Sequence, residues 1–198
     1  MPHEKVVAMD KYSSYSALAK SETEGVDYER VVQPAEGALV AVIAPHAGGI
    51  EPKTGPIAQE IAGTDFSLYC FRGCKANGNS ELHITSHHFD ESECVNLIAR
   101  HKWVVAIHGC NVNGERVFLG GRDKELIADL AAQLAQVGII GETTGHNYLG
   151  TDTNNICNRG RSNAGAQFEL SLSFRNGTQV PAFVRAVRSV LRARQNAA

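Results

Sequence analysis

Two nearly uninterrupted apolar runs decide the fold: ALVAVIA at residues 38–44 and WVVAI at residues 103–107. Their length and their β-branched content predict strands that are buried on both faces, as in the middle of an α/β sheet. Two weaker apolar segments, residues 66–71 and 82–86, predict further strands.

Helical and alternating patterns lie around these runs. Residues 90–93 resemble a helix start with Asp90 as the N-cap, and residues 124–137 and 183–191 carry apolar stripes at helical spacing. Residues 166–174 alternate strictly and predict a half-buried strand with Glu169 on its polar face. Strands interleaved with helices favour a mixed open sheet flanked by helices. The length of 198 residues favours a single domain over residues 1–198.

Composition excludes several classes of protein. A hydrophobic share of 43% excludes a mainly disordered chain, and a formal net charge of −2 gives no bulk basic field for nucleic acid. No apolar run reaches the roughly 20 residues of a membrane span. The N-terminus has no signal-peptide core, so we expect cytoplasmic synthesis. Five cysteines argue against a disulfide framework, and we expect Cys70 and Cys74 to be small buried side chains.

Both apolar runs lead into a histidine: His46 follows the first after Pro45, and His108 directly follows the second. Ligands of open α/β sheets bind beyond the carboxyl ends of the strands, so these side chains can meet there, and Glu51 can fold back across a Gly-Gly bend. Two imidazoles and a carboxylate form a common catalytic zinc shell that leaves one position for water. The alternative is a pair of hydrogen-bonded loop histidines and a surface glutamate, and residue types alone leave both interpretations open.

A metallohydrolase also needs a general base and groups that bind the substrate. Glu169 is the candidate base, although in isolation an ordinary solvent-facing glutamate is the simpler interpretation. Arg159 and Arg161 lie in an amide-rich loop and are suited to gripping a carboxylate through paired N–H donors. A polar surface turn is the alternative there.

Taken together, the motifs resemble the poly-γ-glutamate hydrolase family of phage and bacterial zinc enzymes. The resemblance is carried by PHAGGIE (45–51), LHITS (82–86) followed by Phe89-Asp90, IHG (107–109), and CNRGRSN (157–163) leading to FEL (168–170). An N-terminal stretch from Asp10, with EGVDY at 24–28, fits as well. The similarity runs in order from about residue 10 to residue 177.

The resemblance implies a three-layer fold like that of zinc carboxypeptidases, with Zn²⁺ held by His46, Glu51 and His108. Glu169 matches the general base, and the motif with Arg159 and Arg161 is the one assigned to substrate carboxylates. It also implies a γ-glutamyl polymer as substrate and, for a phage enzyme, release by lysis to degrade a capsule outside the cell. We expect a monomer without nucleic-acid or membrane partners.

Two other functions stay open at this stage. One is a carboxypeptidase-like amidohydrolase acting on other peptides or N-acyl amino acids; the other is a non-catalytic replication-associated or DNA-binding protein. Among the other histidines, adjacent His87 and His88 would point to opposite faces of a strand and are not expected as primary ligands. His146 is expected in a loop, more as a surface residue than as part of a pocket. His83 gives no signal.

Overall fold

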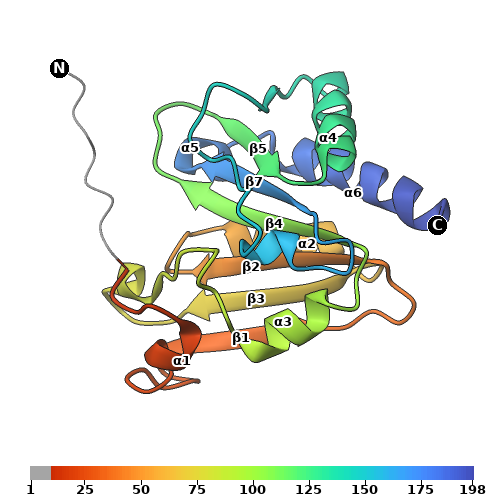
Figure 1. Cartoon of the computed structure of the whole chain (residues 1–198). Coiled ribbons are helices and arrows are strands. Elements are labelled where there is room, and N and C mark those ends of the chain that lie inside the picture. Colours follow the sequence, from red (N-terminus) through yellow and green to blue (C-terminus); the bar gives the residue numbers. More distant parts are fainter. Residues whose placement is uncertain (1–9) are drawn as a thin grey trace.

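The computed structural model describes residues 10–198, and its strands form one mixed sheet in the order β1-β3-β2-β4-β7-β5-β6 (Figure 1). Strands β2, β3, β4 and β7 run parallel, whereas β1 and β5 lie antiparallel to β3 and β7. This confirms the mixed open sheet. Residues 1–9, on which the expected absence of a signal peptide rests, lie outside the described part. The strands are β1 (Tyr28–Gln33), β2 (Val40–Gly48), β3 (Ser67–Gly73), β4 (Trp103–Cys110), β5 (Val117–Gly121), β6 (Gly141–Glu142) and β7 (Ala166–Ser171).

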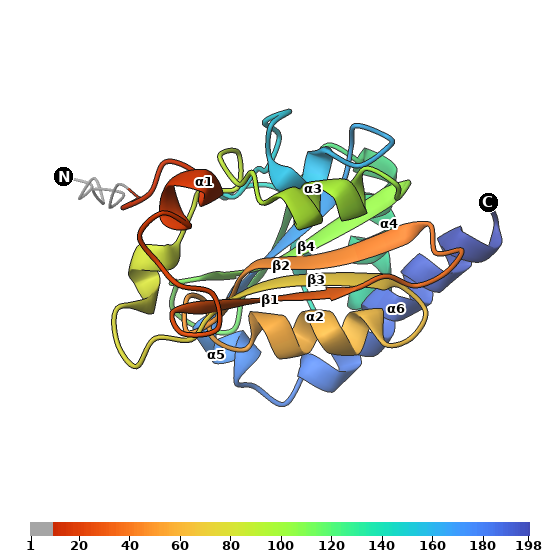
Figure 2. The ribbon, with the colours of Figure 1, turned by 90° about the horizontal axis from the view of Figure 1, so that it is seen from below.

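Helical segments cover both faces of the sheet and complete three layers (Figure 2). One face packs against α2 (Thr54–Ala62), α4 (Lys124–Gln136), α5 (Leu172–Arg175) and α6 (Val180–Asn196). The other face is covered by α1 (Tyr15–Leu18), α3 (Ser92–Ile98) and the 3₁₀ turns η1 (Asn79–Leu82) and η2 (Ile156–Asn158). Because strand side chains alternate, Val40 and Val42 enter the first core while Ala41 and Ile43 enter the second. The continuous apolar runs therefore reflect burial on both faces.

The predicted strand at residues 82–86 is wrong. Its backbone does not pair with the backbone of a strand: the Asp10 carboxylate accepts from Thr85 N, a ring nitrogen of His46 bonds to the Ile84 carbonyl, and the Ser86 carbonyl accepts from Ile156 N. The side chains of Leu82 and Ile84 are buried nonetheless. The apolar signal comes from packing in the core on one face of the sheet, and residues 83–86 follow η1 without forming a strand.

The start of α3 also differs from the prediction. Glu91, not Asp90, caps the helix, because its carboxylate accepts from Glu93 N and Cys94 N. Asp90 instead accepts from the backbone of Tyr15, which begins α1. Arg30 explains the exchange, since its guanidinium pairs with Glu91 at 2.9 Å.

The alternating segment at 166–174 ends as a strand at Ser171, whose hydroxyl accepts from Phe174 N and starts α5. Its polar face is not half-exposed as predicted, because Gln167 is only 4% exposed and β7 lies between β4 and β5. The expectation for the cysteines is also wrong in part, since Cys70 is buried but Cys74 is exposed. Within residues 10–198, no helix combines the length and the apolar character that crossing a bilayer requires.

The carboxyl ends of β2 and β4 separate and leave room for a site. The two strands pair from Val40↔Trp103 to Ile43↔Ala106, and both continue beyond the last pair. The chain leaves β2 for α2 on one face and reaches β4 after α3 on the other, as Figure 2 shows. Such a divergence of adjacent parallel strands is where open α/β sheets bind ligands.

Candidate metal centre

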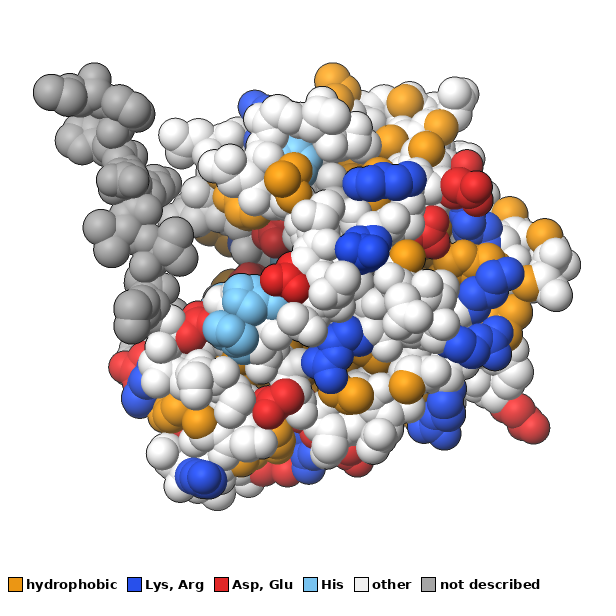
Figure 3. Space-filling view, in the orientation of Figure 1, with side chains coloured by type: hydrophobic (Ala, Val, Ile, Leu, Met, Phe, Trp, Pro, Cys, Tyr) orange, Lys and Arg blue, Asp and Glu red, His pale blue; other side chains and the backbone are white. Residues whose placement is uncertain are grey.

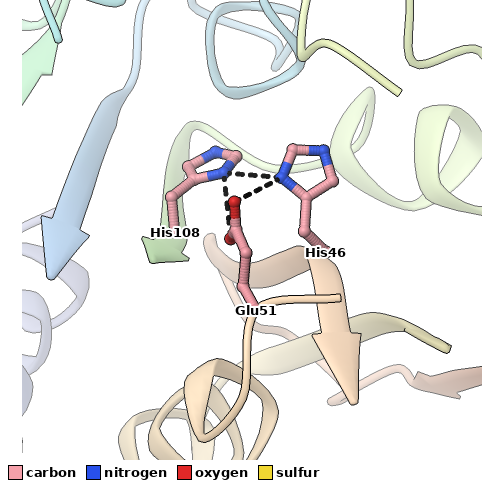
Figure 4. A group of neighbouring side chains, drawn as sticks. All are labelled: His46, Glu51 and His108. Atoms are coloured by element: carbon pink, nitrogen blue, oxygen red, sulfur yellow. Dashed lines mark hydrogen bonds and ion pairs between the residues drawn. The ribbon is translucent and has the colours of Figure 1, made fainter. Parts of the chain in front are cut away.

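His46 near the carboxyl end of β2, His108 near that of β4, and Glu51 just beyond β2 meet as predicted (Figure 4). Nδ1 of His46 lies 3.2 Å from Oε1 of Glu51 and 3.1 Å from Nδ1 of His108. Nδ1 of His108 lies 3.8 Å from Oε2 of Glu51. Three potential ligand atoms therefore face one point, although 62 positions separate the histidines along the chain.

A tight turn after β2 brings Glu51 under His46. Gly48 has a φ of +68°, and a Cβ at this position would overlap the backbone of Gly73, so glycine is required there. The turn is closed by Glu51 N donating to the His46 carbonyl at 2.8 Å. Gly109 N then donates to Oε2 of Glu51 at 2.8 Å, which fixes the carboxylate beside His108.

The hydrogen bond of His46 selects its ligand atom. The carbonyl oxygen of Ile84 only accepts, so Nε2 of His46 carries the proton at 2.8 Å and Nδ1 of the neutral ring has a free lone pair. Nδ1 of His108 faces that lone pair, while its Nε2 lies 3.5 Å from the Ser86 hydroxyl. Two nitrogen lone pairs that face each other repel, so a proton or a cation must lie between Nδ1 of His46 and Nδ1 of His108.

The donor set fits zinc. With Zn–N distances of 2.0–2.1 Å, a tetrahedral ion places two ligating nitrogens about 3.4 Å apart. The observed separations of 3.1, 3.2 and 3.8 Å between the three donors lie around that value. Two imidazoles and one carboxylate also leave a fourth position free for water.

The electrostatics of the cluster favour a cation. Burial acts to raise the pKa of Glu51, but His46 and His108 outweigh it and hold this pKa below its ordinary value. Burial, followed by repulsion from His46, lowers the pKa of His108 to about 3. Burial likewise opposes the charged form of His46, yet Glu51 leaves its pKa raised. The cluster thus combines a buried carboxylate with a neutral His108 ring.

Glu169 lies beside this cluster, because its Cα pairs with that of His108 across β4 and β7. Both side chains point away from the core under α2, since their neighbours Ile107 and Phe168 enter that core. Burial, followed by the charge of Glu51, raises the pKa of Glu169 well above its ordinary value. The predicted general base is therefore next to the predicted ligands.

All four residues line one cavity of about 680 Å³. Figure 3 shows histidine and acidic side chains at the edge of a hollow on this face of the molecule. Asn111, Asn147 and Tyr148 contribute polar groups to the wall, and Gln167 donates to Glu169 at 3.4 Å. The cavity thus combines the candidate metal ligands, a buried carboxyl group and neutral hydrogen-bonding groups.

Arg159 and Arg161 do not line this cavity. Arg159 donates to the Phe89 carbonyl at 2.9 Å, and Arg161 is exposed, with its backbone N–H bonded to the His101 carbonyl. Their proposed contact with substrate stays a prediction that the geometry does not favour. Asn158 in the same loop has a structural role. It is 1% exposed, accepts from Gly165 N and Arg122 N, and donates to two backbone carbonyls.

Sequence reasoning missed His83. Its ring centroid lies 4.1 Å from that of His46, its Nδ1 lies 2.7 Å from the Asp10 carboxylate, and it lines the cavity. It follows Leu82 in a segment interpreted as a strand, so no local pattern marked it.

The other histidines follow the prediction in part. His87 lines the cavity, but neither it nor His88 belongs to the metal-ligand group found within residues 10–198. Their rings lie 4.1 Å apart, so the expected opposite orientation is wrong because the segment is not a strand. His146 accepts from Tyr148 N and packs against Phe118, outside the cavity wall.

Comparison with known proteins places the chain in one family. A family model described as poly-gamma-glutamate hydrolase matches residues 12–185. YndL of Bacillus subtilis (strain 168), a UPF0714 protein, is 35% identical over 176 residues, which are 88% of this chain and 69% of that relative. The SPbeta prophage-derived UPF0714 protein YoqZ of the same strain is 33% identical, covering 90% and 69%.

Solved structures agree with the sequence matches. A structure of a bacteriophage poly-gamma-glutamate hydrolase superposes with a TM-score of 0.91 at 29% identity and covers 96% of this chain and 100% of that one. A structure described as zinc-free apo YndL gives a TM-score of 0.86 at 30% identity, with 93% and 98% covered. The span matched by the family model, residues 12–185, includes the residues that line the cavity. The chain belongs to the poly-gamma-glutamate hydrolase family.

Proposed function

We propose that this protein is a zinc-dependent hydrolase that cleaves γ-glutamyl amide bonds of poly-γ-glutamate. One observation carries the proposal: His46, Glu51 and His108 present their donor atoms to one point in the cavity that also holds Glu169. The family supports the substrate, and the zinc-free description of the YndL structure supports the metal.

In the proposed mechanism, the zinc ion supplies Lewis-acid activation of water and of the amide carbonyl. Glu169 accepts a proton from the attacking water and delivers it to the leaving amine nitrogen, as a general base and then a general acid. Gln167 donates to the Glu169 carboxylate and limits its rotation. Glu51 is held by Gly109 N, so this carboxylate stays a ligand and does not compete for the proton.

The α-carboxylates of the polymer need donors in the cavity. Its wall offers side-chain amides of Asn111 and Asn147 and the hydroxyl of Tyr148, whereas the described residues that line it include no lysine or arginine. We assign carboxylate binding to these neutral donors in place of Arg159 and Arg161. Neutral donors suit a polymer whose fragments must leave after cleavage, because an ion pair with the α-carboxylate at every subsite would slow product release.

The test is incubation of the pure protein with poly-γ-glutamate, with and without a chelator, followed by the polymer length on gels. We expect shortening that the chelator abolishes and zinc restores. Glu169→Gln is expected to keep zinc and to lose 10²-fold or more in kcat, at the lower end of general acid–base contributions of about 10²–10⁴-fold. Exposed Glu60 in α2 provides the matched control, Glu60→Gln. Unchanged polymer with fully metallated protein would refute the substrate, and near-normal rates in Glu169→Gln would refute the base.

A panel of α- and γ-linked glutamyl peptides separates this function from an amidohydrolase that acts on other peptides or N-acyl amino acids. Cleavage restricted to γ-links supports the proposal. We further propose that the chain forms a single domain and is a monomer without nucleic-acid or membrane partners. It would act outside the cell after release by lysis. Gel filtration and the cell fraction in which activity is found test these points.

A further inference from the structure

Arg175, the last residue of α5, is a buried cation that the proposed mechanism does not use. Only 7% of the residue is exposed, although it carries a permanent charge. A buried arginine is costly unless its N–H groups find partners, so its contacts indicate what it stabilises.

Its contacts fall on residues that directly follow three site residues. Nε donates to the carbonyl of Leu170, which follows Glu169, at 3.0 Å. Nη1 donates to the carbonyl of Pro52, which follows Glu51. The guanidinium also packs against Gly109, which follows His108, so closely that a Cβ there would lie 2.6 Å from Cζ.

Arg175 reaches these points from the side of the sheet opposite to the cavity. Its neighbour Phe174 and the β4 and β7 residues Ile107 and Phe168 belong to the core under α2 and α6, whereas His108 and Glu169 alternate to the other face. Figure 2 shows α5 on the same side of the sheet as α2. Arg175 is absent from the cavity wall, and its side-chain hydrogen bonds go to backbone carbonyls, so its place is behind the site and not against substrate.

We propose that Arg175 is a positioning residue that fixes the segments carrying Glu51, His108 and Glu169 relative to one another. This inference rests on the proposed function only in taking Glu51 and His108 as zinc ligands and Glu169 as the general base. A planar guanidinium spans two carbonyls and a flat glycine backbone at once, whereas the single ammonium of lysine does not offer this fork. Glycine at position 109 leaves the room that the guanidinium occupies.

The test measures the affinity for zinc alone, by competition with a fluorescent chelator, in Arg175→Lys, Arg175→Ala and Gly109→Ala. We expect the zinc affinity to fall by at least about tenfold in each, as for other groups that orient metal ligands. Arg188 is the matched control, because it also binds a backbone carbonyl, that of Ile61, but far from the site. Arg188→Lys is expected to keep wild-type zinc affinity.

A double-mutant cycle distinguishes positioning from general stability. Gly109→Ala acts by displacing the Arg175 guanidinium, so it is expected to cause no further loss of zinc affinity once Arg175 is alanine. In zinc-saturated protein, Arg175→Lys is expected to lower kcat and to change KM little, because the residues of the cavity wall that contact substrate are unchanged. Wild-type zinc affinity in Arg175→Ala, or fully additive losses in the double variant, would overturn the inference. Should Arg175→Ala not fold, Arg175→Lys and Gly109→Ala carry the same test.

The outcomes for the two proposals differ. Wild-type protein that binds zinc but leaves the polymer intact refutes the proposed function, while the zinc affinities of the variants still decide the role of Arg175. Wild-type protein that cleaves the polymer, with variants that bind zinc equally well, refutes the role of Arg175 alone. Wild-type protein that binds no zinc overturns both.

Discussion

Glu91→Ala offers a quantitative test of how the layer over the cavity side of the sheet is held. The Glu91 carboxylate is fully buried, accepts from Glu93 N and Cys94 N at the start of α3, and pairs with Arg30. Loss of the helix cap costs about 1 kcal/mol, and loss of a hydrogen bond to a charged group costs about 1.5–3 kcal/mol. Arg30 keeps its ion pairs with Glu24 and Glu93, so the lower part of that range applies.

We therefore expect Glu91→Ala to lower the free energy of unfolding by about 3 kcal/mol. For a chain of this size, each kcal/mol shifts Tm by about 2–4 °C, so the expected fall in Tm is about 6–12 °C. Urea denaturation followed by circular dichroism measures the free energy, and a thermal scan measures Tm.

Asp90→Ala is the matched control. Asp90 is exposed and accepts from the Tyr15 backbone, outside α3, so we expect a loss of about 1 kcal/mol. An equal or larger loss in Asp90→Ala than in Glu91→Ala would refute the assignment of the cap and restore the one expected from the sequence.

Three further predictions test the loops around the site. Arg161→Ala is expected to leave kcat/KM within about twofold, as for an exposed residue outside the cavity, and a tenfold fall in steady-state assays would support its sequence-based role. Gly48→Ala is expected to cost at least about 2 kcal/mol in urea denaturation, because its Cβ overlaps backbone. Gly37→Ala shares a positive φ but meets nothing within 4 Å and should cost about 1 kcal/mol, so equal losses would contradict the argument. Asn158→Ala is expected to cost about 3 kcal/mol and to speed amide exchange in residues 150–165, since it removes four hydrogen bonds to the backbone; unchanged exchange would contradict this.

The strands that carry the candidate metal ligands His46 and His108 are predictable because their signal is local. The runs at 38–44 and 103–107 are apolar throughout, since β2 and β4 are buried on both faces. Parallel neighbours end at the same edge of a sheet, so His46 and His108 come together without knowledge of the loops. Glu51 is predictable as their neighbour because the turn at Gly48 folds the chain back after His46.

The missed features depend on partners that are distant in the chain. Residues 82–86 have the composition of a strand, but Asp10 and His46 provide their backbone partners. His83 enters the site with this loop. Arg175 directly follows the segment at 166–174 that alternates like a strand, and its role appears only when Pro52 and Gly109 are placed around it. Local periodicity does not report such contacts.

The metal content of the pure protein tests the central claim most directly. With zinc supplied and excess removed, we expect about one zinc per chain in the wild type, and almost none in His46→Ala and His108→Ala. His146→Ala, which changes a histidine outside the cavity wall, is expected to keep the wild-type content. Full zinc retention in either His46→Ala or His108→Ala would contradict the proposed ligand set.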